Sequence, residues 1–260
     1  MTDPTTGTVD FQRQGMTARI TLNRPEKLNA ISLEMARRLE TIVAECNRDP
    51  DIRAVILTGA GTRAFCCGTD VKQLEQFTNA WDFRNREDYC LSVRRIVKPV
   101  VCAINGYALG GGLEMALSCD IRIASETARL GAPEIKLGWI GGGGMAAMLS
   151  KNAGMSNAAL MLMTGDPVDA ATARDWHLIS EVVAPEALLS RAEELADTIA
   201  ARAPIAAEHA KINLANAVNM PAVQATQYEL DLQAISFATE DAAEGRAAFA
   251  EKRQPVFHRR

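Results

Sequence analysis

Residues 99–119 read PVVCAINGYALGGGLEMALSC, and this stretch decides the fold. Its length, its GxxxG spacing and its single charge at Glu114 would also suit a dimerising membrane helix. However, residues 99–104 form a short β-branched run, Asn105-Gly106 is a turn signal, and a glycine triplet opens the remainder. Glycines and an asparagine at these places suit a lipid-facing helix poorly. The stretch therefore predicts a buried strand, a turn and a buried helix in a folded core.

The same alternation of strands and helices continues on both sides of this stretch. Residues 54–58 are continuously apolar, which is typical of a parallel strand covered on both faces. From Ile31 the apolar residues follow a helical stripe, and Ser32 is its expected N-cap. The predicted strands are residues 9–12, 16–22, 54–58, 100–104, 121–124 and 179–183, and the predicted helices are residues 31–46, 82–96, 145–153, 157–163 and 170–175.

The pattern changes after Pro185. Residues 186–252 are rich in alanine and helical throughout, with breaks near Pro204 and Pro221 and no strand signal. We therefore predict an α/β core over residues 1–185 and a helical region over residues 186–260.

Composition limits the class of protein. The 260 residues include 48% hydrophobic and 23% charged side chains, which are ordinary globular values. The net charge of −4 gives no sign of a surface for nucleic acid or anionic lipid. Six cysteines without a CxxC pair indicate a reducing compartment. No targeting segment is recognisable at the N-terminus, so a cytoplasmic location is expected.

Several common catalytic and binding motifs are missing. The three histidines have no zinc-ligand spacing, so no metal site is expected, and neither a GxSxG nor a phosphate-loop motif occurs. Residues 59–64 (GAGTRA) resemble a dinucleotide fingerprint after a strand. The residues that follow, 65–70, do not form a helix that would face a pyrophosphate, which disfavours NAD binding.

Two glutamates lie among glycines and apolar side chains. Glu114 is in the first turn of an apolar helix, and Glu134 follows Pro133. Each has a purely structural interpretation, as a carboxylate at a helix start. The alternative is that burial raises the pKa of each carboxyl, so that the pair can exchange a proton and hold one water.

Two backbone segments can supply hydrogen-bond donors. Gly111 opens the helix that carries Glu114, where N–H groups are free and the helix dipole favours negative charge. Gly68-Thr69-Asp70 is a second tight loop, with Asp70 placed to cap a helix from Val71. Two converging donors would form an oxyanion hole. Two ordinary turns are the equally open alternative.

Seven segments resemble a known family in its order and over nearly the whole chain. They are residues 23–30 (NRPEKLNA), 65–71 (FCCGTDV), 105–114 (NGYALGGGLE), 119–120 (CD), 133–138 (PEIKLG), 162–166 (LMTGD) and 251–257 (EKRQPVF). On these motifs the chain resembles the crotonase superfamily, within it the enoyl-CoA hydratase/isomerase family, and most of all the enoyl-CoA hydratases.

The resemblance implies a β-spiral core of ββα units and a C-terminal helical region used in trimerisation, commonly as a homotrimer or a dimer of trimers. It implies an acyl-CoA substrate, with no cofactor apart from the coenzyme A that is part of it. The expected reaction is reversible syn addition of water to a 2-enoyl-CoA. Its implied site residues are Glu114 and Glu134 for catalysis, the N–H groups of Thr69 and Gly111 for the oxyanion hole, and Lys27, Leu28, Cys67, Asp70 and Val71 for coenzyme A.

The chain departs from the family pattern at two places. Thr69 stands where alanine or glycine is usual, and residues 139–144 (WIGGGG) replace a Pro-Gly-containing segment on the acyl side. Phe77, Trp81, Phe83 and Tyr89 are candidates for an acyl-pocket wall or for the packing of a covering helix.

Other functions stay open beside hydration. On the same scaffold they are double-bond isomerisation, hydration of a branched, aromatic or carnitine-like acyl-CoA, and thioester hydrolysis. A non-catalytic member that binds RNA or serves as a structural subunit is a further alternative, against which the net charge and both intact glutamates argue.

Overall fold

Two mixed sheets form the core of the chain in the computed structural model, which describes residues 7–260. The first sheet has the order β1-β2-β3-β5-β7-β10, antiparallel between β1 and β2 and parallel elsewhere. Its strands are β1 (Thr8–Gln14), β2 (Thr17–Asn23), β3 (Ala54–Gly59), β5 (Val100–Ile104), β7 (Ile121–Ser125) and β10 (Glu181–Val183). The strand predicted at residues 179–183 is thus shorter by two residues in the structure.

The second sheet consists of short strands that alternate with those of the first sheet along the chain. Its order is β4 (Ala64–Cys66), β6 (Tyr107–Leu109), β8 (Arg129–Gly131) and β9 (Val168–Asp169). Each of β3, β5 and β7 in the first sheet is followed by a partner strand in the second, and then by helical structure. This repeated ββα path confirms the predicted α/β spiral core, although the sequence predicted none of the four short strands.

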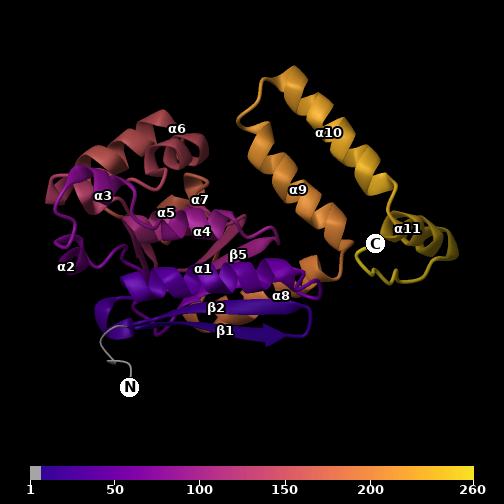
Figure 1. Cartoon of the computed structure of the whole chain (residues 1–260), viewed down its shortest axis with the longest axis horizontal. Coiled ribbons are helices and arrows are strands. Elements are labelled where there is room, and N and C mark those ends of the chain that lie inside the picture. The colour runs from indigo at the N-terminus through magenta and orange to yellow at the C-terminus, as the bar shows by residue number, and fades with distance from the viewer. Residues whose placement is uncertain (1–6) are drawn as a thin grey trace.

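Helices cover both faces of the first sheet (Figure 1). The α-helices of the core are α1 (Leu33–Arg48), α2 (Val71–Leu74), α3 (Ala80–Arg84), α4 (Tyr89–Arg94), α5 (Gly111–Leu117), α6 (Met145–Thr164) and α7 (Ala170–Asp175). The short 3-10 helices are η1 (Pro25–Lys27), η2 (Pro133–Leu137) and η3 (Pro185–Ala187). Strand β3 contributes Val55 and Leu57 to one hydrophobic cluster and Ala54 and Ile56 to another on its opposite face, which explains its uninterrupted apolar sequence.

The local signals near the site are largely confirmed. Ser32 caps α1 by accepting a hydrogen bond from the Met35 N–H, and Asp70 caps α2 by accepting one from the Lys72 N–H. The stretch from 100 to 119 forms β5, β6 and α5 rather than a single helix. Among the described residues, no helix combines the length and the apolar character that a membrane crossing requires.

The single helix predicted over residues 82–96 is wrong. Two short helices, α3 and α4, stand there instead. The carboxylate of Asp88 accepts hydrogen bonds from the N–H groups of Cys90 and Leu91, at 2.8 and 3.2 Å, and so starts α4 anew. A similar break divides α6 at Gly154, whose positive φ of 78° is not helical.

The C-terminal helices differ in how they contact the core. They are α8 (Leu188–Ala200), α9 (Pro204–Ala217), α10 (Ala222–Phe237) and α11 (Glu240–Glu251). Helix α8 packs beneath the first sheet through the small residues Ala192 and Ala196, whereas α9 and α10 form a hairpin that projects away from the sheets (Figure 1). The predicted helical tail is confirmed, and its division from the core at residue 185 stays a prediction.

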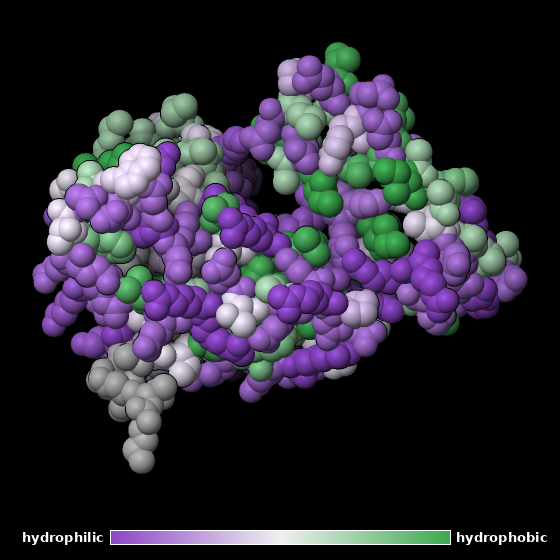
Figure 2. Space-filling model, in the orientation of Figure 1, coloured by the Kyte–Doolittle hydropathy of each residue, from purple (hydrophilic) through white to green (hydrophobic). Residues whose placement is uncertain are grey.

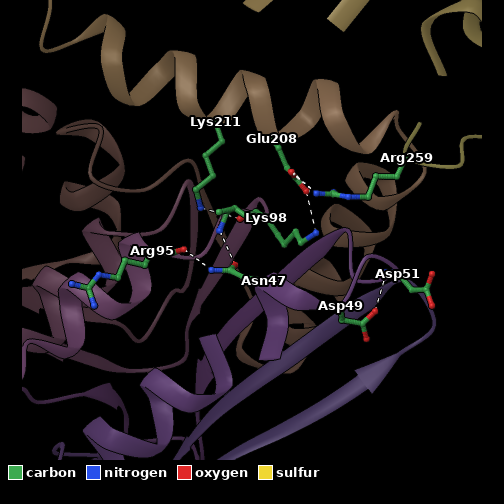
Figure 3. Close-up of polar contacts among 9 residues, drawn as sticks. Asn47, Asp49, Asp51, Arg95, Lys98, Glu208, Lys211 and Arg259 are labelled. Atoms are coloured by element: carbon green, nitrogen blue, oxygen red, sulfur yellow. Dashed lines mark hydrogen bonds and ion pairs between the residues drawn. The ribbon is translucent and has the colours of Figure 1, made fainter. Parts of the chain in front are cut away.

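A buried ion-pair network fastens α9 and the chain end to the core (Figure 3). The Lys98 side chain is fully buried, and its Nζ lies 3.1 Å from a carboxylate oxygen of Glu208. Arg259 also pairs with Glu208, with one contact at 2.9 Å. Burial raises the pKa of Glu208, but the interactions with Arg259 and Lys98 outweigh this, so that the pKa is lowered overall. Lys211 adds an ion pair of 2.8 Å to Asp120.

Replacing Glu208 by alanine is expected to lower the free energy of unfolding by about 3 kcal/mol, because the buried ammonium of Lys98 loses its counter-ion. Urea unfolding at a fixed protein concentration measures the effect. Glu193→Ala is the matched control, since it removes an ion pair of 3.3 Å to Arg19 from a glutamate whose side chain is 37% exposed. The control should cost less than about 1 kcal/mol. Equal losses in both variants would contradict a structural role for the network.

Candidate active site

A cavity of about 440 Å³ lies beside the glycine-rich segments around residues 68, 111 and 142. Parts of four segments line it, residues 67–74, 83–90, 110–114 and 133–143. The first segment holds the tight loop singled out from the sequence, the third holds the glycine-rich helix start and Glu114, and the fourth holds Glu134. The fold therefore brings together residues that lie between positions 67 and 143 of the chain.

The N–H group of Thr69 points away from its neighbouring strand segment. The flanking residues are engaged, since the Gly68 carbonyl accepts from the Ile31 N–H at 2.8 Å and the Asp70 N–H donates to the Ile31 carbonyl at 3.0 Å. Because N–H groups alternate in direction along an extended segment, the Thr69 N–H faces the side opposite to Ile31. Thr69 itself lines the cavity.

The N–H group of Gly111 is available for a different reason. It belongs to the first turn of α5, where no helical acceptor exists. Gly110 precedes it as the N-cap, with a φ of 56°, and donates its own N–H to the Gly131 carbonyl at 2.9 Å. Within residues 7–260, neither the Thr69 nor the Gly111 N–H donates a backbone hydrogen bond.

These two segments are in direct contact. A Cβ atom added to Gly68 would lie 3.0 Å from the Gly111 nitrogen, which is too close for an ordinary contact. One added to Gly112 would lie 1.9 Å from the Cys66 carbonyl oxygen. The glycines therefore allow the backbones of the two segments to touch, and both lie along the same cavity wall.

Glu114 is held firmly beside this wall. It is only 5% exposed, and its Oε1 accepts hydrogen bonds from the N–H groups of Gly143 and Met145, at 2.8 and 3.2 Å. Burial raises its pKa, the two N–H donors lower it, and the net shift is upward. The Arg94 guanidinium in turn binds the Gly143 carbonyl, which fixes the loop that holds the carboxylate.

Glu134 has a less polar environment. Its Oε1 lies against Gly110, 2.7 Å from where a Cβ there would stand. Its Oε2 is buried and has no hydrogen-bond partner among residues 7–260. Burial raises the pKa of Glu134, its own backbone N–H lowers it, and the negative charge of Glu114 raises it further. The charge of Glu114 thus acts on Glu134, and the two carboxyls differ in the donors that surround them.

The five residues expected to bind coenzyme A are only partly collected by the cavity. Cys67 and Val71 line it, and the Cys67 N–H donates to the Leu28 carbonyl at 3.1 Å, which places Leu28 and the exposed Lys27 alongside. Asp70 is engaged in capping α2 and in an ion pair of 2.8 Å with Arg24. Binding of coenzyme A by these residues stays a prediction.

The four aromatic residues considered for an acyl-pocket wall divide into two pairs. Phe83 and Tyr89 line the cavity, whereas Phe77 packs edge-on against Phe83 and Trp81 is 71% exposed. The Tyr89 hydroxyl also forms a hydrogen bond of 3.0 Å with the Thr69 hydroxyl.

Sequence reasoning missed three features of the cavity. It did not identify the Tyr89–Thr69 hydrogen bond, the Arg86 side chain in the lining, or the Arg94 contact to the Gly143 loop. No pattern in the sequence indicates these three features, because each depends on how residues 83–94 pack against the core. Within residues 7–260, no group of three or more His, Cys, Asp or Glu side chains is arranged to hold a metal ion.

Comparisons with known proteins show the family and the fold of the chain. A family model described as enoyl-CoA hydratase/isomerase matches residues 12–260. The chain is 38% identical to a probable enoyl-CoA hydratase of Mycobacterium bovis, with 97% of this chain and 98% of that protein covered. It is 39% identical to an (E)-benzylidenesuccinyl-CoA hydratase of Thauera aromatica, with 92% and 94% covered. A crystal structure of an enoyl-CoA hydratase from Bacillus anthracis superposes with a TM-score of 0.89 at 34% identity, covering 97% of this chain and 99% of that one.

The raised pKa of Glu114 predicts how a neutral substitute changes stability with pH. A carboxyl whose pKa is higher in the folded chain stabilises it below the pKa of the unfolded chain, and this contribution is lost as the pH rises through the folded pKa. Glu114→Gln does not titrate. Its free energy of unfolding, relative to wild type, should therefore increase between pH 4.5 and pH 7.5 in urea titrations. If the difference in unfolding free energy between the variant and the wild type stayed constant over this range, the pKa of Glu114 would not be raised in the folded chain.

Proposed function

Because the chain belongs to the enoyl-CoA hydratase/isomerase family, we propose that it is an enoyl-CoA hydratase that adds water reversibly, with syn geometry, to 2-enoyl-CoA thioesters. One observation carries the proposal: Glu114 and Glu134 line the same cavity as Thr69 and Gly111, whose N–H groups donate no backbone hydrogen bond within residues 7–260. Hydration requires a base for water, a proton donor for the adjoining carbon and a site for the charge between them, and this arrangement offers all three.

In the proposed mechanism the thioester oxygen accepts hydrogen bonds from the N–H groups of Thr69 and Gly111. Glu114 takes a proton from water as the water oxygen bonds to Cβ of the substrate. The electron pair of the double bond moves toward the thioester, and the two N–H groups stabilise the enolate-like charge on its oxygen. Glu134 then delivers a proton to Cα.

The different surroundings of the two carboxyls support these roles. Two N–H groups donate to Glu114, and such donors stabilise a carboxylate that can act as a base. The Oε2 of Glu134 has no donor among residues 7–260, and the charge of Glu114 also favours its protonated form. A protonated Glu134 beside an ionised Glu114 is the starting state that the mechanism needs.

Coenzyme A is proposed to bind along the segments that carry Lys27, Leu28, Cys67, Asp70 and Val71. The ammonium of Lys27 is exposed and suits a phosphate, and Val71 offers an exposed apolar surface at the cavity. In this proposal Asp70 acts through its ion pair with Arg24, which fixes the loop beside Thr69.

A bulky acyl group is the second candidate for the substrate. Phe83, Trp139 and Ile140 line the cavity and offer apolar surface to such a group, next to the charged residues 84, 86, 87 and 88 of the same lining. The similarity to a hydratase of an aromatic acyl-CoA supports the same view. Turnover of a panel of straight, branched and aromatic enoyl-CoA thioesters would rank these substrates.

Self-association through the C-terminal helices is part of the proposal. In Figure 2 apolar side chains gather on the lobe that α9 and α10 form. The large apolar residues exposed on α9, α10 and α11 are Ile212, Leu214, Val223, Leu230, Ile235, Phe237 and Phe249. Exposed apolar surface of this extent is typical of a protein interface, which supports the expected homotrimer or dimer of trimers.

Glu134→Gln is expected to slow the hydration of crotonyl-CoA by about a hundredfold to ten-thousandfold, because the variant cannot deliver a proton to Cα. Loss of the enoyl absorbance measures turnover, and binding of the saturated butyryl-CoA should stay near the wild-type level. Glu126→Gln, at an exposed position outside the cavity, is the control.

Unchanged turnover in Glu134→Gln would remove this residue from the mechanism. If the wild-type protein left every enoyl-CoA unhydrated but shifted its double bond, the isomerase alternative would replace the hydratase. A protein that left all thioesters unchanged would favour a binding function.

A further inference from the structure

We propose that the Tyr89 hydroxyl is a third hydrogen-bond donor to the thioester oxygen, beside the N–H groups of Thr69 and Gly111, and that the Thr69 hydroxyl holds it in place. The inference rests on the proposed function, since it assumes that an acyl oxygen binds between residues 69 and 111. It concerns two side chains whose hydroxyl groups meet within the cavity.

The Tyr89 hydroxyl lies against both residues of the proposed oxyanion hole. Its oxygen is 1.9 Å from the position that a Cβ on residue 111 would take, and its ring carbon Cζ is 3.0 Å from that position. The same oxygen is 3.0 Å from the Thr69 Oγ1. An acyl oxygen that reaches the N–H groups of Thr69 and Gly111 therefore also comes near this hydroxyl.

The backbone around Tyr89 keeps the ring in this place. Tyr89 begins α4, whose first turn is capped by the Asp88 carboxylate. The next residue, Cys90, donates from its Sγ to the Gly111 carbonyl at 3.4 Å, which joins α4 directly to the first turn of α5. The Tyr89 side chain is 8% exposed, so the ring has little freedom to swing away.

The chemistry of the hydroxyl suits a donor rather than a base. Burial raises the pKa of Tyr89 well above its ordinary value, and the nearby charge of Glu114 acts in the same direction. The phenol therefore keeps its proton. When charge develops on the acyl oxygen, the Tyr89 O–H can donate to it while the Thr69 O–H donates to the Tyr89 oxygen, and such a chain strengthens each bond.

This arrangement gives Thr69 a reason to differ from the small residue that is usual at its position. A side chain without a hydroxyl would leave the Tyr89 oxygen with no partner on that side. It also gives a reason for glycine at residue 111, because a Cβ there would lie 1.9 Å from the Tyr89 oxygen. The pair Thr69 and Tyr89 thus acts as one unit in the proposal.

The test compares Tyr89→Phe with the wild-type enzyme in two measurements. With crotonyl-CoA, the variant should lose about tenfold to a hundredfold in kcat, with KM within about twofold, because the lost bond is strongest in the transition state. With bound butyryl-CoA, the infrared stretch of the thioester carbonyl should move to higher frequency, because one donor fewer polarises it. Tyr107→Phe, at an exposed tyrosine outside the cavity, should change neither.

The Thr69 variants separate donation from packing. Thr69→Val removes the hydroxyl at nearly constant volume, so it should lower kcat and raise the carbonyl frequency, each by less than Tyr89→Phe does. Thr69→Ser keeps a hydroxyl, so both quantities should stay near their wild-type values. A carbonyl frequency that does not change in Tyr89→Phe would overturn the inference, even if kcat falls, since Tyr89 would then only pack. The infrared measurement needs no turnover, so it decides about Tyr89 even if the protein hydrates no enoyl-CoA.

Discussion

The contact between two backbone segments, 66–69 and 110–112, is the constraint on which the rest of the structure depends. At Gly112 a side chain would need the space of the Cys66 carbonyl, and at Gly68 it would press on the Gly111 nitrogen. Because no side chains intervene, strand β4 and the start of α5 lie close enough for two N–H groups to line one cavity wall. The second sheet makes this possible, since it pairs β4 with β6 and leads the chain directly into α5.

The surroundings of Glu114 and Glu134 in this cavity determine how easily each carboxyl gives up its proton. Glu114 receives two hydrogen bonds from the segment that Arg94 binds, while the half-buried Glu134 lies against Gly110 and its Oε2 has no hydrogen-bond partner among residues 7–260. Burial raises the pKa of both carboxyls, but two N–H groups donate to Glu114, whereas the negative charge of Glu114 raises the pKa of Glu134 further. The same principle extends to the tail of the chain, where the buried Lys98 obtains its counter-ion only because α9 and Arg259 return to the core.

Sequence patterns predicted those parts of the fold in which a signal is repeated over many residues. The apolar stripe of α1 and the continuous apolar run of β3 are of this kind, and both lie where they were expected. The second sheet went unpredicted because strands such as β4 and β6 have only three residues, too few to show an alternation.

Sequence patterns predicted those site residues that lie together in one motif. They did not predict contacts between residues of separate helices and loops. Glu114 and Gly111 lie within one glycine-rich segment, and the sequence placed them together. Tyr89 and Thr69 are 20 residues apart and meet only because Asp88 restarts the chain as α4 beside α5. A contact of that kind depends on packing between elements, which a propensity for helix does not encode.

The most direct measurement is a crystal structure of the protein with an unreactive enoyl-CoA analogue bound. The account predicts that the thioester oxygen lies within about 3 Å of the nitrogen atoms of Thr69 and Gly111, with Cβ facing Glu114 and Cα facing Glu134. An oxygen bound away from both nitrogens, or a double bond that neither carboxyl faces, would contradict it.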